Sequence, residues 1–265
     1  MYDFAYHRPS SLAEATALLA ADPEAKVISG GMSLILVLKQ RLARPSALID
    51  LGGIPDLVGI SVSATAVLIK GRTPHAAVAA SPEVKRAIPA LAELASHIGD
   101  AQVRNRGTIG GSIANHDPTA DYPAAALGLG AAVHTSKRKI AADDFFTGLF
   151  STALEPDEIV TAVEFPIPEK AAYVKFPNPA SRYAMVGVFV AKGPMGVRVA
   201  VTGAGANGVF RHTAMEQALA RSWSPEALEG IVTAEENLNS DIHASREYRA
   251  HLVGVMAKRS VAKAG

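Results

Sequence analysis

The first part of the chain alternates between two spacings of apolar side chains. Apolar residues three or four positions apart indicate a helix, whereas short β-branched or continuous apolar runs bounded by glycine and proline indicate strands. These patterns predict, in order, a helix over 11–21, a strand over 26–28, a helix over 34–43 and a strand over 47–51. Strand, helix and strand in close succession predict a small βαβ-type unit that ends at about residue 55.

Beyond residue 55, short strands are interspersed with helices, which indicates a second α+β subdomain. The predicted strands are 59–62, 66–71, 131–135 and 158–165, and the predicted helices are 73–80, 81–96 and 122–130. Pro166 and Pro168 then mark a boundary. We therefore expect a first domain over 1–167, with subdomains of about 1–55 and 56–167, and a second domain over 168–265.

The second domain has a simpler pattern, because its strand-like runs come first and its helices last. The predicted strands are 171–176, 184–191 and 196–204, and the predicted helices are 211–220, 225–237 and 245–258. The whole chain is therefore predicted to be an α+β protein.

Composition narrows the classes of function. The chain carries 26 basic and 25 acidic residues, a net charge of +1, which leaves no strong field to recruit nucleic acid or an anionic membrane. No apolar run approaches the roughly 18–20 residues that cross a bilayer, and the opening residues lack the pattern of a secretory signal. We expect a cytoplasmic protein with no integral membrane segment.

The sequence contains no cysteine. Iron–sulfur clusters are held by cysteine thiolates, and structural zinc sites and disulfides also depend on cysteine. A redox function would therefore require a bound organic cofactor, with any metal cluster on another polypeptide.

A glycine pair joins the predicted strand 26–28 to the helix that follows. Glycine lets the backbone approach an anion closely, and the amides at a helix start are hydrogen-bond donors. The residues of this first loop are Val27, Ile28, Ser29, Gly30, Gly31, Met32, Ser33 and Leu34. Taken alone, the pattern also fits a tight turn in which Ser33 caps the helix, so both readings stay open.

A second glycine pair follows about 80 residues later, in Thr108, Ile109, Gly110, Gly111 and Ser112. One diphosphate bound between the two loops would explain both pairs. Asp121 could accept a hydrogen bond from a ribityl or ribose hydroxyl, although a helix N-cap is the competing role.

The other candidate motifs in the chain have simpler interpretations. Residues 203–208 fit the G-x-G-x-x-G pattern, but no second strand ending in an acidic residue follows, so we interpret them as a flexible exit from a strand. The eight histidines form no zinc-binding pair, and His116 with Asp117 and Asp121 is only a weak candidate metal cluster. The G-x-S-x-G elbow and the P-loop are both missing, which argues against a hydrolase or a kinase.

Four spaced motifs give the chain a family resemblance. They are the first loop together with residues 39–51, residues 98–112, Asp121 thirteen positions after Thr108, and residues 158–166 followed by 173–176. Together they resemble the FAD-binding medium subunits of carbon monoxide dehydrogenase and its relatives in the xanthine dehydrogenase family of molybdenum hydroxylases. The resemblance covers nearly the whole chain.

This resemblance implies a two-subdomain FAD-binding domain of the PCMH type and a C-terminal domain with a three-stranded antiparallel sheet and helices. It also implies that the two glycine loops contact FAD, together with Ile98, Asp121, Val160 and Lys175. Met32 departs from relatives that often carry a polar residue here, so some side-chain hydrogen bonding to FAD is expected to be lost. No catalytic or metal-ligating residue is predicted.

The expected function is electron transfer within a complex. Electrons would pass from a [2Fe-2S] small subunit through FAD to an external acceptor, while a molybdopterin-binding large subunit oxidises the substrate, so we expect a hetero-oligomer. A free-standing FAD-dependent oxidoreductase and a flavin-less assembly module are the alternatives. The sequence shows no acid–base pair for substrate chemistry, which disfavours the first of these.

Overall fold

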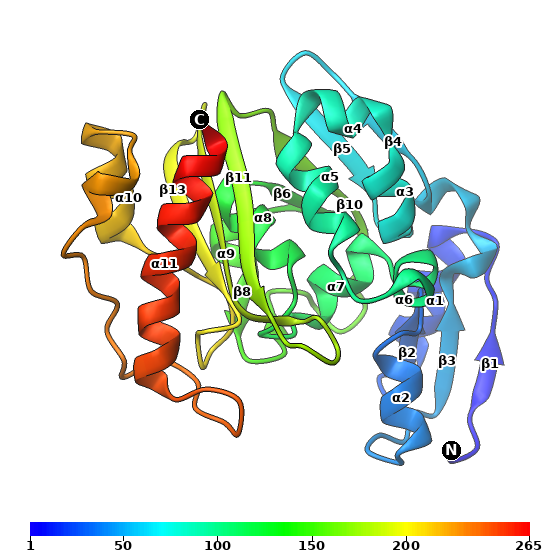
Figure 1. Cartoon of the computed structure of the whole chain (residues 1–265). Coiled ribbons are helices and arrows are strands. Elements are labelled where there is room, and N and C mark those ends of the chain that lie inside the picture. Colours follow the sequence, from blue (N-terminus) through cyan, green and yellow to red (C-terminus); the bar gives the residue numbers. More distant parts are fainter.

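The structure is a computed structural model that describes all residues from 1 to 265. It contains three main sheets, which follow one another along the chain and across the molecule in Figure 1. The first sheet is parallel, with strand order β1-β3-β2. Its elements are β1 (Ala5–His7), α1 (Leu12–Ala21), β2 (Lys26–Ile28), α2 (Leu34–Lys39) and β3 (Ala47–Asp50).

The predicted βαβ unit is confirmed, because β2 pairs in parallel with β3 across α2. Two details differ from the sequence prediction. The helix predicted to reach residue 43 ends at Lys39, and Arg41 adopts a left-handed conformation with φ +58° that no helix tolerates. The strand β1 was not predicted, since its three side chains are all exposed and give no apolar signal.

The second sheet is antiparallel, with strand order β4-β5-β10-β6-β7. Its strands are β4 (Ile60–Val62), β5 (Ala66–Lys70), β6 (Ala132–Thr135), β7 (Lys139–Ala141) and β10 (Val160–Pro166). The helices of this part are α3 (His75–Ala80), α4 (Pro82–Ala87), α5 (Pro89–Ser96), α6 (Ala101–Arg106), α7 (Ile109–Asn115), α8 (Tyr122–Leu129) and α9 (Ala142–Phe145). A hairpin of β8 (Phe146–Gly148) and β9 (Ser151–Thr152) lies between α9 and β10 in sequence.

Proline divides the helix that was predicted over 81–96. Ile88 precedes Pro89 and has φ −141° and ψ 77°, outside the helical region, so α4 and α5 are separate helices. The proline ring disfavours a helical conformation in the residue before it, which explains the break.

The third sheet is antiparallel, with strand order β11-β12-β13-β14, and confirms the predicted antiparallel sheet of the C-terminal domain. Its elements are β11 (Lys170–Pro177), β12 (Ala184–Gly193), β13 (Gly196–Thr202), β14 (Phe210–Arg211), α10 (Thr213–Arg221) and α11 (Arg246–Ala264). The two-residue β14 extends the three predicted strands. The helix predicted over 225–237 is wrong, because only a 3₁₀ helix at Pro225–Leu228 forms before Gly230 turns the chain with φ +75°.

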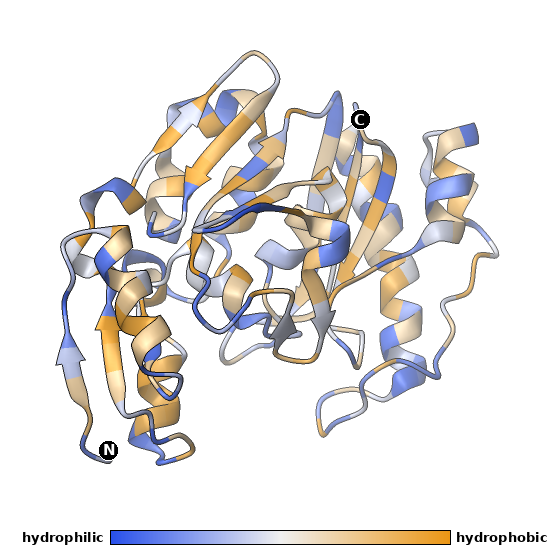
Figure 2. Ribbon diagram, turned by 180° about the vertical axis from the view of Figure 1, so that it is seen from behind, coloured by the Kyte–Doolittle hydropathy of each residue, from blue (hydrophilic) through white to orange (hydrophobic).

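Helices cover both faces of this third sheet. Along β12, Val188 and Val190 pack with α10 and α11, whereas Phe189 and Ala191 between them pack into the core beneath α5 and α8. This alternation is the period of two of a strand, and it explains why β12 is apolar almost throughout. The long α11 shows both hydrophobic and hydrophilic colours along its length in Figure 2, as expected for a helix with one buried face.

The largest hydrophobic core joins the second sheet, the helices α3, α4, α5, α7, α8 and α9, and the inner face of the third sheet. A separate small core lies under the first sheet and includes Ile159, which comes from the segment just before β10. The first sheet is therefore anchored to the rest of the molecule near the start of β10. None of the helices is both long and apolar enough to traverse a lipid bilayer.

Candidate functional site

The first glycine loop, Ser29 to Ser33, connects the end of β2 to the start of α2. Gly31 has φ +74°, a conformation that favours glycine, and lets the chain turn sharply into the helix. The backbone N–H groups of five successive residues, Gly30 to Leu34, donate to no acceptor within the protein, and the Ser33 side chain makes no capping hydrogen bond. The first loop therefore presents a row of unused donors, as an anion-binding loop requires.

The second glycine pair is part of a helix. Thr108 is the N-cap of α7, and its Oγ1 accepts a hydrogen bond from the N–H of Gly111 at 3.2 Å. The N–H of Ile109 donates to Thr73 O at 3.2 Å and that of Gly110 to Gly71 O at 2.8 Å. The second loop thus uses most of its amides internally, and it differs in this respect from the first.

Gly110 and Gly111 have different physical roles. A Cβ on Gly110 would lie 2.7 Å from Gly71 O, so this glycine allows α7 to pack against the end of β5. A Cβ on Gly111 would approach only Thr108 Oγ1, at 3.0 Å, and Gly111 is exposed. Of these two glycines, only Gly111 has open space beside its Cα into which a ligand could fit.

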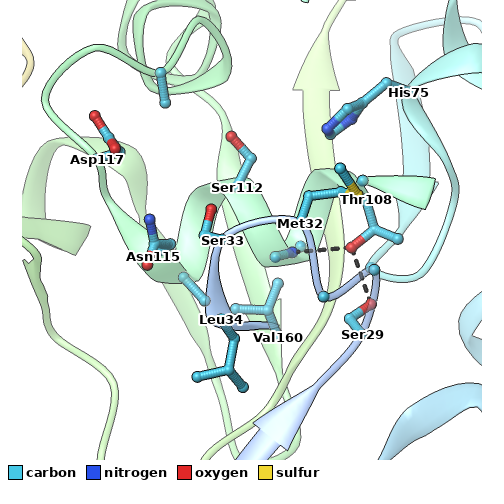
Figure 3. Close-up of a pocket in the computed structure, with 18 of the residues that line it drawn as sticks. Ser29, Met32, Ser33, Leu34, His75, Thr108, Ser112, Asn115, Asp117 and Val160 are labelled. Atoms are coloured by element: carbon cyan, nitrogen blue, oxygen red, sulfur yellow. Dashed lines mark hydrogen bonds between the residues drawn. The ribbon is translucent and has the colours of Figure 1, made fainter. Parts of the chain in front are cut away.

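The two loops meet although 79 residues separate them. Ser29 Oγ and Thr108 Oγ1 are hydrogen-bonded at 2.9 Å, and a Cβ on Gly30 would overlap the carbonyl oxygen of Arg106. Figure 3 shows this contact, with the side chains of Ser33, Ser112 and Asn115 nearby. The two glycine loops therefore lie side by side, as the sequence predicted, and their side chains are in contact.

Beside this junction lies a cavity of about 810 Å³, within the size range of ligand pockets. All of the residues predicted to bind the cofactor line it except Ile109 and Lys175. Those that line it are Val27, Ile28, Ser29, Gly30, Gly31, Met32, Ser33, Leu34, Ile98, Thr108, Gly110, Gly111, Ser112, Asp121 and Val160. Ile109 is fully buried in the core instead.

Asp121 and Lys175 form a buried ion pair between the two domains. Lys175 Nζ lies 3.0 Å and 3.2 Å from the two oxygens of Asp121 and donates to His97 O at 2.9 Å, and Tyr173 donates its hydroxyl to Asp121 at 2.5 Å. Burial raises the pKa of Asp121, and the charge of Lys175 and the hydroxyl of Tyr173 oppose this shift. Asp121 makes no capping hydrogen bond, so the N-cap role is not the one observed.

The wall of the cavity contains few positive charges. Lys26 is its only lysine or arginine, whereas Asp117, Asp121 and Glu158 are carboxylates. A negatively charged ligand would therefore be held mainly by neutral donors, such as backbone N–H groups and hydroxyls.

Several lining residues had no signal in the sequence. The hairpin β8–β9 and the segment after it contribute Phe150 and Leu154, and the loop between β11 and β12 contributes Ser181 and Tyr183. These residues lie outside the glycine loops and reach the cavity only through the tertiary fold. Phe150 is 58% exposed, a property that only the structure reveals.

The remaining motifs have local explanations. Nowhere do three or more metal-ligating side chains gather, and His116 Nδ1 pairs with Ser151 O at 2.9 Å. Residues 203–208 follow β13 and lead into β14 rather than directly into a helix, as expected of an exit from a strand.

A cavity bounded by glycine loops and shared between two domains characterises the class of proteins that bind an extended, phosphate-containing cofactor. Comparison with known proteins identifies the family. A family model described as the FAD binding domain in molybdopterin dehydrogenase matches residues 2–168, and one described as the CO dehydrogenase flavoprotein C-terminal domain matches residues 171–264.

Similar proteins agree over almost the full chain. The nicotine 6-hydroxylase medium subunit of Paenarthrobacter nicotinovorans is 36% identical, over 98% of this chain and 96% of that protein. The carbon monoxide dehydrogenase medium chain of Afipia carboxidovorans is 35% identical over the same shares. A structure of reconstituted CO dehydrogenase from Oligotropha carboxidovorans matches with a TM-score of 0.91 and 34% identity, over 99% of this chain and 98% of that one.

The chain belongs to the family of FAD-binding medium subunits of molybdenum hydroxylases. The resemblance noted in the sequence is thereby confirmed, as are the fold class and FAD as the cofactor of the family.

Proposed function

We propose that this chain holds one FAD in the cavity and acts as the electron-transfer subunit of a molybdenum hydroxylase complex. Electrons would come from the [2Fe-2S] clusters of a small subunit and leave to an external acceptor, while a molybdopterin-binding large subunit oxidises the substrate. The observation that supports the proposal most strongly is the meeting of two glycine loops at a single cavity, joined by Ser29 and Thr108.

The residues present fit FAD at each chemical part of the cofactor. The free N–H groups from Gly30 to Leu34 suit the diphosphate, and the open space over Gly111 lets it approach the backbone. The carboxylate of Asp121 suits a ribityl or ribose hydroxyl, and Ile98 and Val160 supply apolar wall. Lys175, which does not line the cavity, would act by holding Asp121 in place.

When bound, FAD supplies the redox chemistry, because it can exchange electrons singly or in pairs. The protein's own contribution is to bind the cofactor, to orient it and to exclude water from its buried part.

The proposed iron–sulfur partner follows from the absence of cysteine in this chain. It has no cysteine and therefore cannot ligate an iron–sulfur cluster. We propose a hetero-oligomer in the cytoplasm, with domain boundaries at 1–167 and 168–265 and subdomains of about 1–55 and 56–167.

The first test is the colour of the protein. We expect the purified chain to absorb at about 450 nm and to bleach on reduction, with one FAD per chain. A colourless chain that takes up no added FAD would contradict the proposal.

A glycine variant tests the site. Gly111→Val should abolish FAD retention because the side chain would fill the open space over Gly111 and keep the diphosphate from approaching the backbone there. Gly254→Val on α11 is the matched control, since a Cβ there meets no atom within 4 Å, and it should retain FAD. Equal FAD content in both variants would show that the second loop does not bind the cofactor.

A further inference from the structure

His75 borders the cavity beside the second glycine loop, and the proposed site gives it no role. It is the first residue of α3, and its backbone N–H donates to Gly107 O at 3.0 Å. A Cβ on Gly107 would lie 2.6 Å from His75 Nε2, so the ring presses against the backbone that leads into Thr108. Figure 3 shows the ring above Thr108 and Met32 in the cavity wall.

The imidazole of His75 is buried without being satisfied. The residue is only 5% exposed, and Nδ1 has no hydrogen-bond partner. Its ring packs at 5.3 Å from the ring of Tyr122, whose hydroxyl is likewise unpartnered. A buried polar group normally has a partner, because its removal from water is otherwise uncompensated.

His75 is also held in its neutral form. Burial, and then the charge of Arg104, lower its pKa to about 4. A neutral imidazole has one N–H donor and one acceptor nitrogen. At neutral pH the cavity wall therefore contains an uncharged imidazole whose N–H donates to no protein group.

The location of this donor indicates its ligand. His75 touches Gly107, directly before Thr108. Thr108 is hydrogen-bonded to Ser29 of the first loop, whose backbone amides are unused. With Lys26 as the only strongly basic residue in the wall, an anion at this junction depends on neutral donors.

We propose that His75 is a further FAD-binding residue, which donates an imidazole N–H to an oxygen of the FAD diphosphate. The inference rests on the proposed function, since it names an additional ligand of the same site.

The test compares substitutions that remove or retain the donor. His75→Leu keeps the approximate volume but has no N–H, and should weaken FAD binding about tenfold to hundredfold. His75→Gln places an amide near the position of Nε2 and His75→Asn one near Nδ1, so one of them should restore most of the affinity and identify the donating nitrogen. Binding is measured by quenching of flavin fluorescence on titration into apo protein.

Two further measurements separate a direct contact from a packing role. In ³¹P NMR of bound FAD, His75→Leu should shift one of the two diphosphate resonances. In wild-type protein carrying ¹⁵N-labelled histidine, FAD should shift the ring ¹⁵N signals of His75. His134→Leu is the control, because His134 pairs with Glu164 and does not line the cavity, and it should leave FAD affinity unchanged.

The outcomes are distinct. Wild-type FAD affinity in His75→Leu, a loss that neither amide variant restores, or unshifted ¹⁵N signals would each overturn the role of His75 while leaving the FAD site intact. Failure of the wild-type chain to bind FAD would instead overturn the proposed function itself.

Discussion

At the scale of single residues, Glu158 shows how a buried carboxylate can remain ionised at the edge of the cavity. Its side chain has no exposed surface. Burial opposes ionisation, but hydrogen bonds from Arg138 at 3.1 Å, Thr135 at 2.5 Å and the N–H of Glu155 at 2.9 Å outweigh it and lower the pKa of Glu158 to about 2. The folded state therefore binds the Glu158 proton more weakly than the unfolded state does.

This shift predicts a pH-dependent contribution to stability. A carboxyl whose pKa is lowered by folding stabilises the protein above its ordinary pKa, and the contribution disappears as the pH falls toward the folded pKa. We expect Glu158→Gln to lower the free energy of unfolding by about 2–3 kcal/mol at about pH 7. This difference in stability between the variant and wild type should become smaller as the pH falls from about 4.5 to about 2. Urea unfolding across this range measures it, and a gap that does not change with pH would contradict the assignment.

The sequence locates the glycine loops but does not distinguish their members. Gly110 and Gly111 are adjacent and look equivalent, yet Gly110 faces the backbone of Gly71 and only Gly111 faces open space. The difference depends on a neighbour 39 positions earlier in the chain, which no local pattern reveals. Ile109 was predicted to bind FAD as a member of the second loop, and Lys175 from the family resemblance. Neither lines the cavity, because a motif gives the position of a residue along the chain and not the direction of its side chain.

At the scale of elements, the N-cap of α7 connects helix stability to the cofactor site. Thr108 Oγ1 accepts from the N–H of Gly111 and is hydrogen-bonded to Ser29 of the first loop. We predict that Thr108→Val lowers the free energy of unfolding by about 1 kcal/mol and weakens FAD binding, because loss of the hydroxyl uncaps α7 and separates the two loops.

A second capping residue provides the control for this prediction. Ser81 caps α4 through the N–H of Val84 and does not line the cavity. Ser81→Ala should therefore cost a similar free energy of unfolding, about 1 kcal/mol, with unchanged FAD affinity. Urea unfolding and flavin titration of both variants make the comparison. If both bind FAD as wild type does, the Ser29–Thr108 contact has no part in the site.

Elements with strong periodicity were predicted well, and the failures have physical causes. The helix α1 and the strands β2 and β12 follow their apolar patterns closely. The predicted helix over 225–237 failed because apolar spacing there competes with Gly230, whose positive φ ends the segment. The β8–β9 hairpin was missed because its strands are too short for an alternating pattern to register.

At the scale of the whole molecule, the cavity draws its walls from all three sheets. The first sheet supplies the loop after β2, the second supplies α7 and the start of β10, and the loop between β11 and β12 supplies Ser181 and Tyr183. The two glycine loops were predicted from glycine chemistry, and Val160 at the start of β10 from the family resemblance. The loop between β11 and β12 was not predicted, because a loop that reaches a site from another domain carries no motif of its own.

The ion pair of Asp121 and Lys175 is a buried polar connection between these parts at the cavity. Asp121 directly precedes α8 in the first domain, Lys175 lies on β11 in the second, and their side chains are only 5% and 6% exposed. Removing one partner of a buried pair leaves the other charge without compensation, which typically costs about 3–5 kcal/mol.

We therefore predict that Lys175→Met destabilises the chain by about 3–5 kcal/mol at about pH 7 and weakens FAD binding, since Asp121 loses the ammonium that holds it. The loss of stability should become smaller as the pH falls, because burial already raises the pKa of Asp121 and a protonated carboxyl needs no cation. Lys139→Met is the matched control: Lys139 is 65% exposed beside Glu164, and its removal should cost no more than about 1 kcal/mol. Urea unfolding with and without FAD measures both variants. Equal losses in the two would mean that the buried pair contributes no more to the junction of the domains than a surface pair does.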